Sequence, residues 1–444
     1  MTNEERQAIR QGTDLREIVA EDREVIRRGT VTWSLCPFHD DHHPSLAVER
    51  DHYHCYACGA HGDALDYVMA IHGLSFPEAA ENLASRAGVE LARGASDNAR
   101  ADHGVRADHC RRTRHAIRVV AHRARERLMQ ATGDDVTRAC DWLTHTGIGD
   151  ETRERWSIGF LADDAIRSLG AQAGVLPGVA SLAGCVTFPI SDALGRPVGI
   201  AGVIPDAASH GALAGLASLT VPATVGEAHE GKAPYVREAL AGVTQARESI
   251  RRTGEAVVTL APPQAASLQD MGATHAVSTM GGGLSARQAT RLARLGAARV
   301  TLLFPRTAAG RLAARASLPA ATQSGTDVMW ATPPEGGVRA LRRQGMAALS
   351  AAVARAAWLV DAVVSEFVEG ARLEDPDDLL DAVRATCATL RCAVGDVWQA
   401  CACASSVARA FRVCRPETLY GALLDGSPLG DSSWEERRDG RSGR

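Results

Sequence analysis

The apolar positions of residues 1–91 follow helical spacing on both sides of a segment rich in cysteine and histidine. A helix is predicted directly after Asp14, because aspartate caps helix N-termini through its carboxylate. Two more helices are predicted, one from about residue 63 and one over 76–87, where apolar side chains recur every three or four positions. Residues 92–105 lack this periodicity and are predicted to be a linker.

Strand-like apolar runs appear in the sequence beyond the linker. Residues 106–250 combine helical stretches with two apolar runs, 185–190 and 197–203, whose intervening turn predicts a β-hairpin. In residues 251–335 short apolar runs alternate with helical segments, a pattern typical of βαβ units around a parallel sheet.

The last part of the chain changes character again. Residues 336–425 carry apolar faces at helical spacing and predict a helical bundle, while 426–444 are polar and predicted to be disordered. The expected fold class is therefore a multidomain combination of α+β and α/β units.

Composition narrows the class of protein. The chain has 444 residues, 45% apolar and 23% charged, which excludes wholesale disorder. Its 49 basic and 53 acidic residues exclude a uniformly basic nucleic-acid coat. The polar N-terminus and the lack of a long apolar run predict a cytoplasmic protein that makes no membrane contact. In a reducing compartment, clustered cysteines indicate metal binding more often than disulfides.

One stretch departs from the near-neutral net charge of the whole chain. Between Arg100 and Arg127 nine arginines stand against three acidic residues. This excess could follow a phosphate backbone, or it could be the solvated face of a helix, and charge alone does not separate the two.

The strongest chemical signal is a pair of short metal-ligand motifs. Cys36 and His39 are separated by two residues, as are Cys55 and Cys58, and fifteen residues lie between the two pairs. Zinc prefers four tetrahedral sulfur and nitrogen ligands, which two such pairs supply when an intervening hairpin brings them together. Four protein ligands leave no open position, so we expect one structural zinc per chain. His42 and His43 are alternatives to His39 that the spacing disfavours.

A longer string around these ligands resembles the zinc-binding domain of bacterial-type DNA primases. It consists of CPFHDDHHPSL (36–46), YHCYACGAHGDALDYVM (53–69) and GLSFPEAAENLA (73–84). The resemblance implies that the strand face of a zinc ribbon binds single-stranded template DNA. Tyr53 and Tyr56 would then stack on bases and Arg50 would contact phosphate, although packing within a small metal domain explains the tyrosines equally well.

The rest of the chain is similar to the primase RNA polymerase core. Residues 141–160 resemble the opening of that core, 188–202 its hairpin, and 255–331 its toprim subdomain, an α/β module that holds divalent metal. The family's tyrosine-containing template segment corresponds to KAPYVR, which makes Lys232 and Arg237 candidate DNA contacts.

The carboxylates that the resemblance leads one to expect are missing. Leu260 stands in the position of the family's glutamate, and Pro305 and Thr307 stand in the positions of its Asp-x-Asp pair. The acidic string expected after the last strand retains only Glu335. Because Mg²⁺ is held by oxygen ligands, no catalytic residue is predicted and Mg²⁺ is expected only if the core is active.

Two functional classes follow. In one, the protein belongs to the primase family, binds single-stranded DNA through its zinc ribbon and has a non-catalytic or accessory role in replication. In the other, it is a primase that makes short RNA primers at the replication fork. A third possibility is half of a split primase completed by a second primase chain, and a replicative helicase is a candidate partner.

Overall fold

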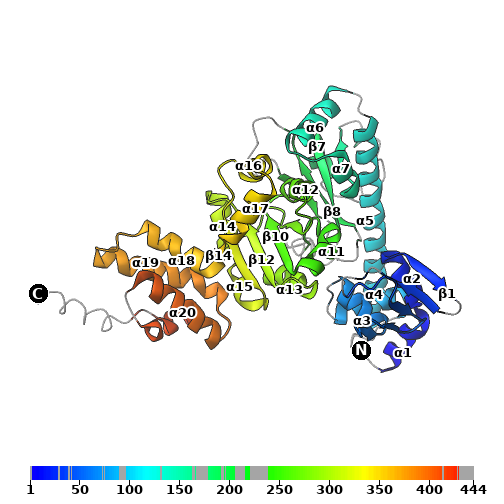
Figure 1. The fold of residues 1–444 in the computed structure, drawn as a ribbon, viewed down its shortest axis with the longest axis horizontal. Coiled ribbons are helices and arrows are strands. Elements are labelled where there is room, and N and C mark those ends of the chain that lie inside the picture. The colour runs from blue at the N-terminus through cyan, green and yellow to red at the C-terminus, as the bar shows by residue number, and fades with distance from the viewer. Residues whose placement is uncertain are drawn as a thin grey trace, which may run out of the picture.

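The computed structural model describes residues 3–28, 31–38, 41, 43–72, 74, 76–89, 97–130, 133–162, 166, 179–191, 195, 197–205, 216–220, 239–412, 415–427 and 429. The zinc-ribbon domain and the C-terminal helices lie at opposite ends of the molecule, with two further sheets between them (Figure 1). Among the described helices, none combines the length and the apolar character that a bilayer crossing requires.

The N-terminal domain is an antiparallel sheet of five strands, in the order β1-β2-β3-β4-β5, packed against helices. The predicted N-cap is confirmed, since the Asp14 carboxylate accepts from the Arg16 N–H at 3.0 Å. The predicted hairpin is also confirmed, with Leu46 opposite Cys55 and Val48 opposite Tyr53. The elements are α1 (Asn3–Gly12), α2 (Leu15–Asp22), β1 (Val25–Arg28), β2 (Val31–Ser34), β3 (Leu46–Val48), β4 (Tyr53–Cys55), β5 (His61–Gly62), α3 (Ala64–His72) and α4 (Phe76–Ala87).

Helix α5 (Asp97–Gln130) corrects the predicted linker. Residues 92–96 lie outside the described part, but from Asp97 onward the supposed linker is helical. Residues 97–105 contain no proline, and Ala99, Arg100 and Ala101 are residues of high helix propensity. The segment belongs to a helix whose described buried residues include Ile117, Val120 and Ala124.

The second sheet is antiparallel, with the order β6-β7-β8-β9. The predicted hairpin is confirmed in β7 and β8, which pair from Val186 opposite Val203 to Ser191 opposite Pro197. The elements here are α6 (Asp134–His145), α7 (Asp150–Arg155), β6 (Gly159–Leu161), η1 (Val179–Leu182), β7 (Cys185–Ser191), β8 (Pro197–Val203) and β9 (Leu216–Thr220).

The third sheet has the order β11-β10-β12-β13-β14, and its first four strands are parallel, as the alternating pattern predicts. Because all four point the same way, the residues that follow them meet at one carboxyl edge. The elements are α11 (Val243–Thr253), β10 (Glu255–Thr259), α12 (Pro262–Asp270), β11 (Ala276–Ser278), α13 (Ala286–Arg294), β12 (Arg299–Leu303), α14 (Ala308–Ala316), α15 (Leu318–Gln323) and β13 (Asp327–Ala331).

The C-terminal region is helical, as predicted, but it also supplies the short strand β14, which pairs antiparallel with β13. Its apolar residues join those of the sheet in one continuous core, and α18 (Leu359–Gly370) packs against β13 and β14. Most of the polar tail 426–444 lies outside the described residues. The elements are α16 (Gly337–Gln344), α17 (Met346–Ala354), β14 (Ala357–Trp358), α18 (Leu359–Gly370), α19 (Pro376–Leu390), η3 (Arg391–Ala393), α20 (Val397–Phe411), η4 (Pro416–Leu419) and α21 (Tyr420–Leu424).

Candidate metal centre and nucleic-acid interface

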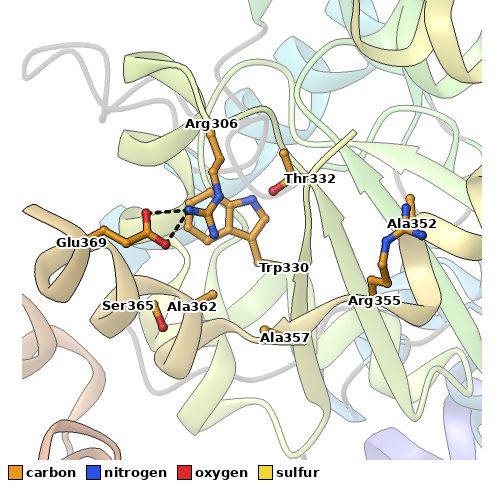
Figure 2. Close-up of a pocket in the computed structure, with 9 residues that line it drawn as sticks. All are labelled: Arg306, Trp330, Thr332, Ala352, Arg355, Ala357, Ala362, Ser365 and Glu369. Carbon is orange, nitrogen blue, oxygen red and sulfur yellow. Dashed lines mark hydrogen bonds and ion pairs between the residues drawn. The ribbon is translucent and has the colours of Figure 1, made fainter. Parts of the chain in front are cut away.

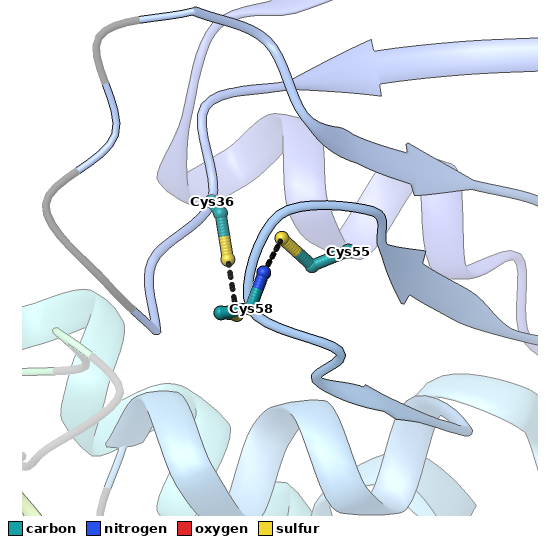
Figure 3. Close-up of side chains that lie close together, drawn as sticks. All are labelled: Cys36, Cys55 and Cys58. Carbon is teal, nitrogen blue, oxygen red and sulfur yellow. Dashed lines mark hydrogen bonds between the residues drawn. The ribbon is translucent and has the colours of Figure 1, made fainter.

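The ribbon strands bring three of the four predicted metal ligands together. Cys36 follows β2, Cys55 ends β4, and Cys58 lies in the tight turn after it (Figure 3). Their sulfur atoms all lie within 4.8 Å of one another, and those of Cys36 and Cys58 are 3.8 Å apart. The fourth predicted ligand, His39, lies outside the described residues.

Two backbone N–H donors and one hydroxyl lie beside the sulfurs. The Phe38 N–H points to the Cys36 sulfur and the Cys58 N–H to the Cys55 sulfur, each at 3.4 Å. The Ser45 hydroxyl lies 3.3 Å from the Cys55 sulfur. The two N–H contacts stabilise negative charge on sulfur, so the turns are shaped to hold thiolates.

The loop that carries Cys36 is itself fixed by a carboxylate. Asp41 accepts hydrogen bonds from the Cys36 N–H at 2.7 Å and from the Ser45 hydroxyl at 2.6 Å. One side chain thus connects the loop after β2 to the residue before β3. Partners of this kind orient metal ligands before the ion arrives.

The cysteine pKa values differ according to burial and hydrogen bonding. Burial raises the pKa of the Cys36 thiol, although the Phe38 N–H opposes the effect. Burial also acts to raise the pKa of Cys55, but hydrogen bonds, chiefly from the Cys58 N–H, outweigh it and hold that pKa at about 6. Because one thiolate is already favoured and two more sulfurs lie beside it, the donor set fits the soft, positively charged zinc ion.

The two tyrosines proposed as base-stacking residues occupy different environments. Tyr53 is only 4% exposed, and its ring packs on Phe38 and Tyr67 at centroid distances of 5.3 and 5.7 Å. Burial raises the pKa of Tyr53 to about 12. This packing corrects the prediction of Tyr53 as a DNA contact, because a buried ring leaves no face on which a base could stack. Tyr56, in contrast, is 72% exposed.

Tyr56 belongs to an aromatic row that the sequence analysis missed. The strand register places Trp33, Ala47, His54 and His61 side by side on the same face of the sheet. The ring of Tyr56 stacks on Trp33 at 5.8 Å and meets His54 edge-on at 4.8 Å. The alternation of residue types in β2 could not have placed Trp33 on the open face, because the polar Thr32 and Ser34 are the side chains that point into the domain.

The remaining predicted DNA contacts are dispersed or not described. Arg50 is exposed in the turn between β3 and β4, where it donates to the Gln11 carbonyl at 3.2 Å. Lys232 and Arg237 lie outside the described residues.

Ion pairs neutralise part of the basic stretch between Arg100 and Arg127, at positions whose side chains the structure describes. Three arginines of α5 form ion pairs, Arg123 with Glu126, Arg125 with Glu154 and Arg127 with Asp135. These pairs support the alternative of a solvated, ion-paired helix face over that part of α5.

The carboxyl edge of the parallel sheet carries no carboxylate at the three matched positions. Leu260 follows β10 and is 3% exposed, in the same apolar cluster as Phe304. Pro305 follows β12, and Thr307 caps α14 by accepting from the Gly310 N–H at 3.2 Å. Glu335, after β13, is exposed.

An arginine occupies this edge instead. Arg306 lies between Pro305 and Thr307 and pairs with Glu369 of α18 at 3.1 Å (Figure 2). Its guanidinium also lies over the ring of Trp330, 5.7 Å from the centroid. These residues line a cavity of about 280 Å³ between the sheet edge and α18, together with Thr332, Ala352, Arg355, Ala357, Ala362 and Ser365.

The other nearby acids do not join a cluster at this edge. Glu255 begins β10, at the opposite edge of the sheet, and faces Arg299 at 3.9 Å. Asp270 ends α12 and pairs with Arg342 at 2.8 Å, while it also accepts from the Gly149 N–H. Both acids are thus engaged away from the positions that would hold a metal for phosphoryl transfer.

Comparison with known proteins places these features in one family. The CHC2 zinc finger family matches residues 1–99. The DNA primase of Geobacillus stearothermophilus is 29% identical over 358 residues, which cover 74% of this chain and 56% of that protein. The DNA primase of Deinococcus radiodurans is 30% identical over 305 residues, covering 64% and 48%. The chain therefore spans about half the length of the curated relatives it matches.

Solved structures share the fold at low sequence identity. The zinc-binding and RNA polymerase domains of the Aquifex aeolicus primase align with a TM-score of 0.52 and 21% identity, over 94% of this chain and 99% of that one. A primase catalytic domain bound to single-stranded DNA aligns with a TM-score of 0.55 and 18% identity, over 70% and 99%. The solved structures show that the chain shares the primase fold. The zinc-finger match, the curated relatives and the cysteine cluster assign it to the bacterial-type DNA primase family.

Proposed function

We propose that this protein acts in DNA replication as a zinc-ribbon protein that binds single-stranded template DNA without synthesising primers itself. The observation that carries the proposal is the carboxyl edge of the parallel sheet. There Leu260 is buried, Thr307 caps a helix, and Arg306 pairs with Glu369. Mg²⁺ requires several oxygen ligands, which these three residues do not supply. The guanidinium of Arg306, held at this edge by its ion pair, also repels a cation.

The zinc centre of this proposal has four ligands and one ion per chain. Cys36, Cys55 and Cys58 already converge, and His39 follows Cys36 at a spacing that suits a metal-binding turn. With four protein ligands the ion holds the ribbon together and takes no part in a reaction. The cluster thus supports a structural role.

The DNA-binding surface of this proposal is the aromatic row formed by Trp33, His54, Tyr56 and His61. Aromatic rings on an open sheet face bind single strands by stacking with bases, largely irrespective of sequence. The exposure of Tyr56 and its contacts with Trp33 and His54 support this assignment.

The polar contacts of the proposal are Arg50 near the ribbon and Lys232 and Arg237 in the core, each to phosphate. The partner in this proposal is a replicative helicase or a second primase chain. Either would bring this cytoplasmic protein to the replication fork.

Primer synthesis is the direct test of the inactive core. The purified full chain is incubated with single-stranded template, labelled ribonucleotides and Mg²⁺ or Mn²⁺, beside an active primase from a relative. We expect no primer ladder. A ladder made by this chain, and absent from a mock preparation, would overturn the proposal of a non-catalytic core.

DNA binding is tested separately by fluorescence anisotropy with a labelled single strand. Stacking contributes about 1–3 kcal/mol per base, so Tyr56→Ala should weaken binding by about 5- to 150-fold. Tyr53→Phe is the matched control, because that ring is buried and should leave the affinity unchanged. Equal affinities for wild type and Tyr56→Ala would remove the aromatic row from the DNA-binding surface.

A further inference from the structure

An arginine of the α/β core reaches into the zinc-ribbon domain. Arg251 lies in the last turn of α11. This helix is on the side of the core nearest the ribbon (Figure 1). The Arg251 guanidinium donates to the carbonyls of Ala70 at 2.9 Å, Ile71 at 3.1 Å and Pro37 at 3.3 Å. One side chain thus connects two units that are far apart in sequence.

The acceptors explain why an arginine suits this position. Ala70 and Ile71 lie at the end of α3, where the last carbonyls of a helix lack partners within the helix and carry partial negative charge. A guanidinium offers five N–H donors in a planar fork, enough for three divergent carbonyls. Burial lowers the pKa of Arg251, and the nearby charge of Glu248 opposes that effect.

The third acceptor belongs to the metal centre itself. Pro37 lies between Cys36, a zinc ligand of the cluster, and Phe38, whose N–H points to the Cys36 sulfur. A metal ion on the Cys36 sulfur therefore restrains the backbone that carries the carbonyl bound by Arg251. A second contact supports the same interface, an ion pair of Arg23 with Glu248 at 2.9 Å.

We infer that Arg251 docks the zinc-ribbon domain on the α/β core, and that zinc binding and docking reinforce each other through the Pro37 carbonyl. Without zinc, the loop after Cys36 loses an anchor, and one of the three acceptors is no longer held in place. Because linkage is reciprocal, loss of the docking contact lowers zinc affinity in turn. The inference does not depend on whether the ribbon binds DNA or the core makes primers.

The test uses the full chain with Arg251→Ala, Arg251→Lys and, as matched control, Arg252→Ala, whose side chain is exposed on the same turn of α11. Hydrogen exchange is followed in peptides from α3 and α11, and zinc affinity is measured by competition with a chelator. Peptides from β12 report whether the core of each variant remains folded. Small-angle scattering reports the separation of the domains.

We expect zinc-loaded Arg251→Ala to exchange faster at the end of α3 and in α11 and to have a larger radius of gyration. Its affinity for zinc should be lower than that of the wild type by a factor of about five or more. Arg251→Lys should fall between this variant and wild type, because an ammonium cannot serve three divergent carbonyls as well. Zinc removal should produce the same opening in the wild-type chain. The inference is overturned if Arg251→Ala exchanges and binds zinc like Arg252→Ala, or if zinc removal leaves α11 as protected as before.

Discussion

A substitution of Leu260 tests whether the carboxyl edge of the parallel sheet belongs to the apolar core or can still hold a metal ligand. Leu260 stands where the resemblance to primases places a glutamate, yet it is 3% exposed and packs in the same apolar cluster as Phe304. The substitution Leu260→Glu introduces at this position the glutamate that the resemblance to primases leads one to expect. If the edge is part of the core, the substitution destabilises the sheet and recovers no metal site.

The magnitude follows from burial. Removing a fully buried leucine side chain costs about 1.5–3 kcal/mol of hydrophobic stabilisation. An unpaired buried carboxylate adds several kcal/mol unless it takes up a proton. At neutral pH we therefore expect a loss of at least about 3 kcal/mol, which is roughly a 150-fold increase in the opening equilibrium of the sheet.

The pH dependence has a definite sign. A carboxyl group buried among apolar side chains has a raised pKa, so the folded state binds more protons than the unfolded state, whose glutamate titrates at about 4.3. Stability then falls as the pH rises above that value. The deficit of Leu260→Glu should accordingly be smaller at pH 5 than at pH 8.

Hydrogen exchange of peptides from β10 and β12 measures the local opening free energy, which suits a chain of several domains. The matched control is Leu312→Glu on α14, because Leu312 is 71% exposed and its replacement should change stability by no more than about 0.5 kcal/mol. The reasoning is refuted if Leu260→Glu is as stable as Leu312→Glu, or if millimolar Mg²⁺ returns its exchange to the wild-type level.

Three further changes probe other parts of the molecule. Cys55→Ser should lose zinc and unfold the ribbon, as seen by metal analysis and circular dichroism, whereas Cys140→Ser, outside the cluster, should keep about one zinc per chain. Asp270 has a lowered pKa, since hydrogen bonds outweigh its burial, so its contribution to stability is present above pH 3.8 and lost as the pH falls below it. Asp270→Asn should therefore be less stable than wild type at pH 7 and equal to it in strong acid, as denaturant titrations at both pH values would show. Gly310→Ala should destabilise α14 by about 1–3 kcal/mol in local hydrogen exchange, because its Cβ would lie 1.9 Å from the Pro305 carbonyl oxygen; unchanged exchange would contradict that packing.

Much of the fold could be predicted because its signals are local. Asp14 caps α2 through its own side chain, and the strands and helices of residues 251–335 show the periodicity of buried faces. The prediction was wrong for residues 97–105, where helix propensity continues α5 although no apolar periodicity marks it. It also missed β14, because two residues are too few to show a period.

The candidate site was predictable to the extent that spacing determines it. Cys36, Cys55 and Cys58 converge because closely spaced ligands in turns are brought together by the hairpin between them. Tyr53 and Tyr56 could not be separated in the same way. Which of the two rings lies against Phe38 and which faces solvent depends on the packing of the ribbon on its helices.

The sequence by itself determined the spacing of the candidate metal ligands, the alternation of strands and helices over residues 255–331, and the absence of acids at Leu260, Pro305 and Thr307, since these depend on residue identity and local periodicity. Only the tertiary structure decided that Arg306 meets Glu369 at the sheet edge and that Arg251 joins the core to the ribbon. Such contacts join residues widely separated in sequence. They form where helix ends and sheet edges leave polar groups without local partners, and no local pattern specifies which distant side chain will supply one.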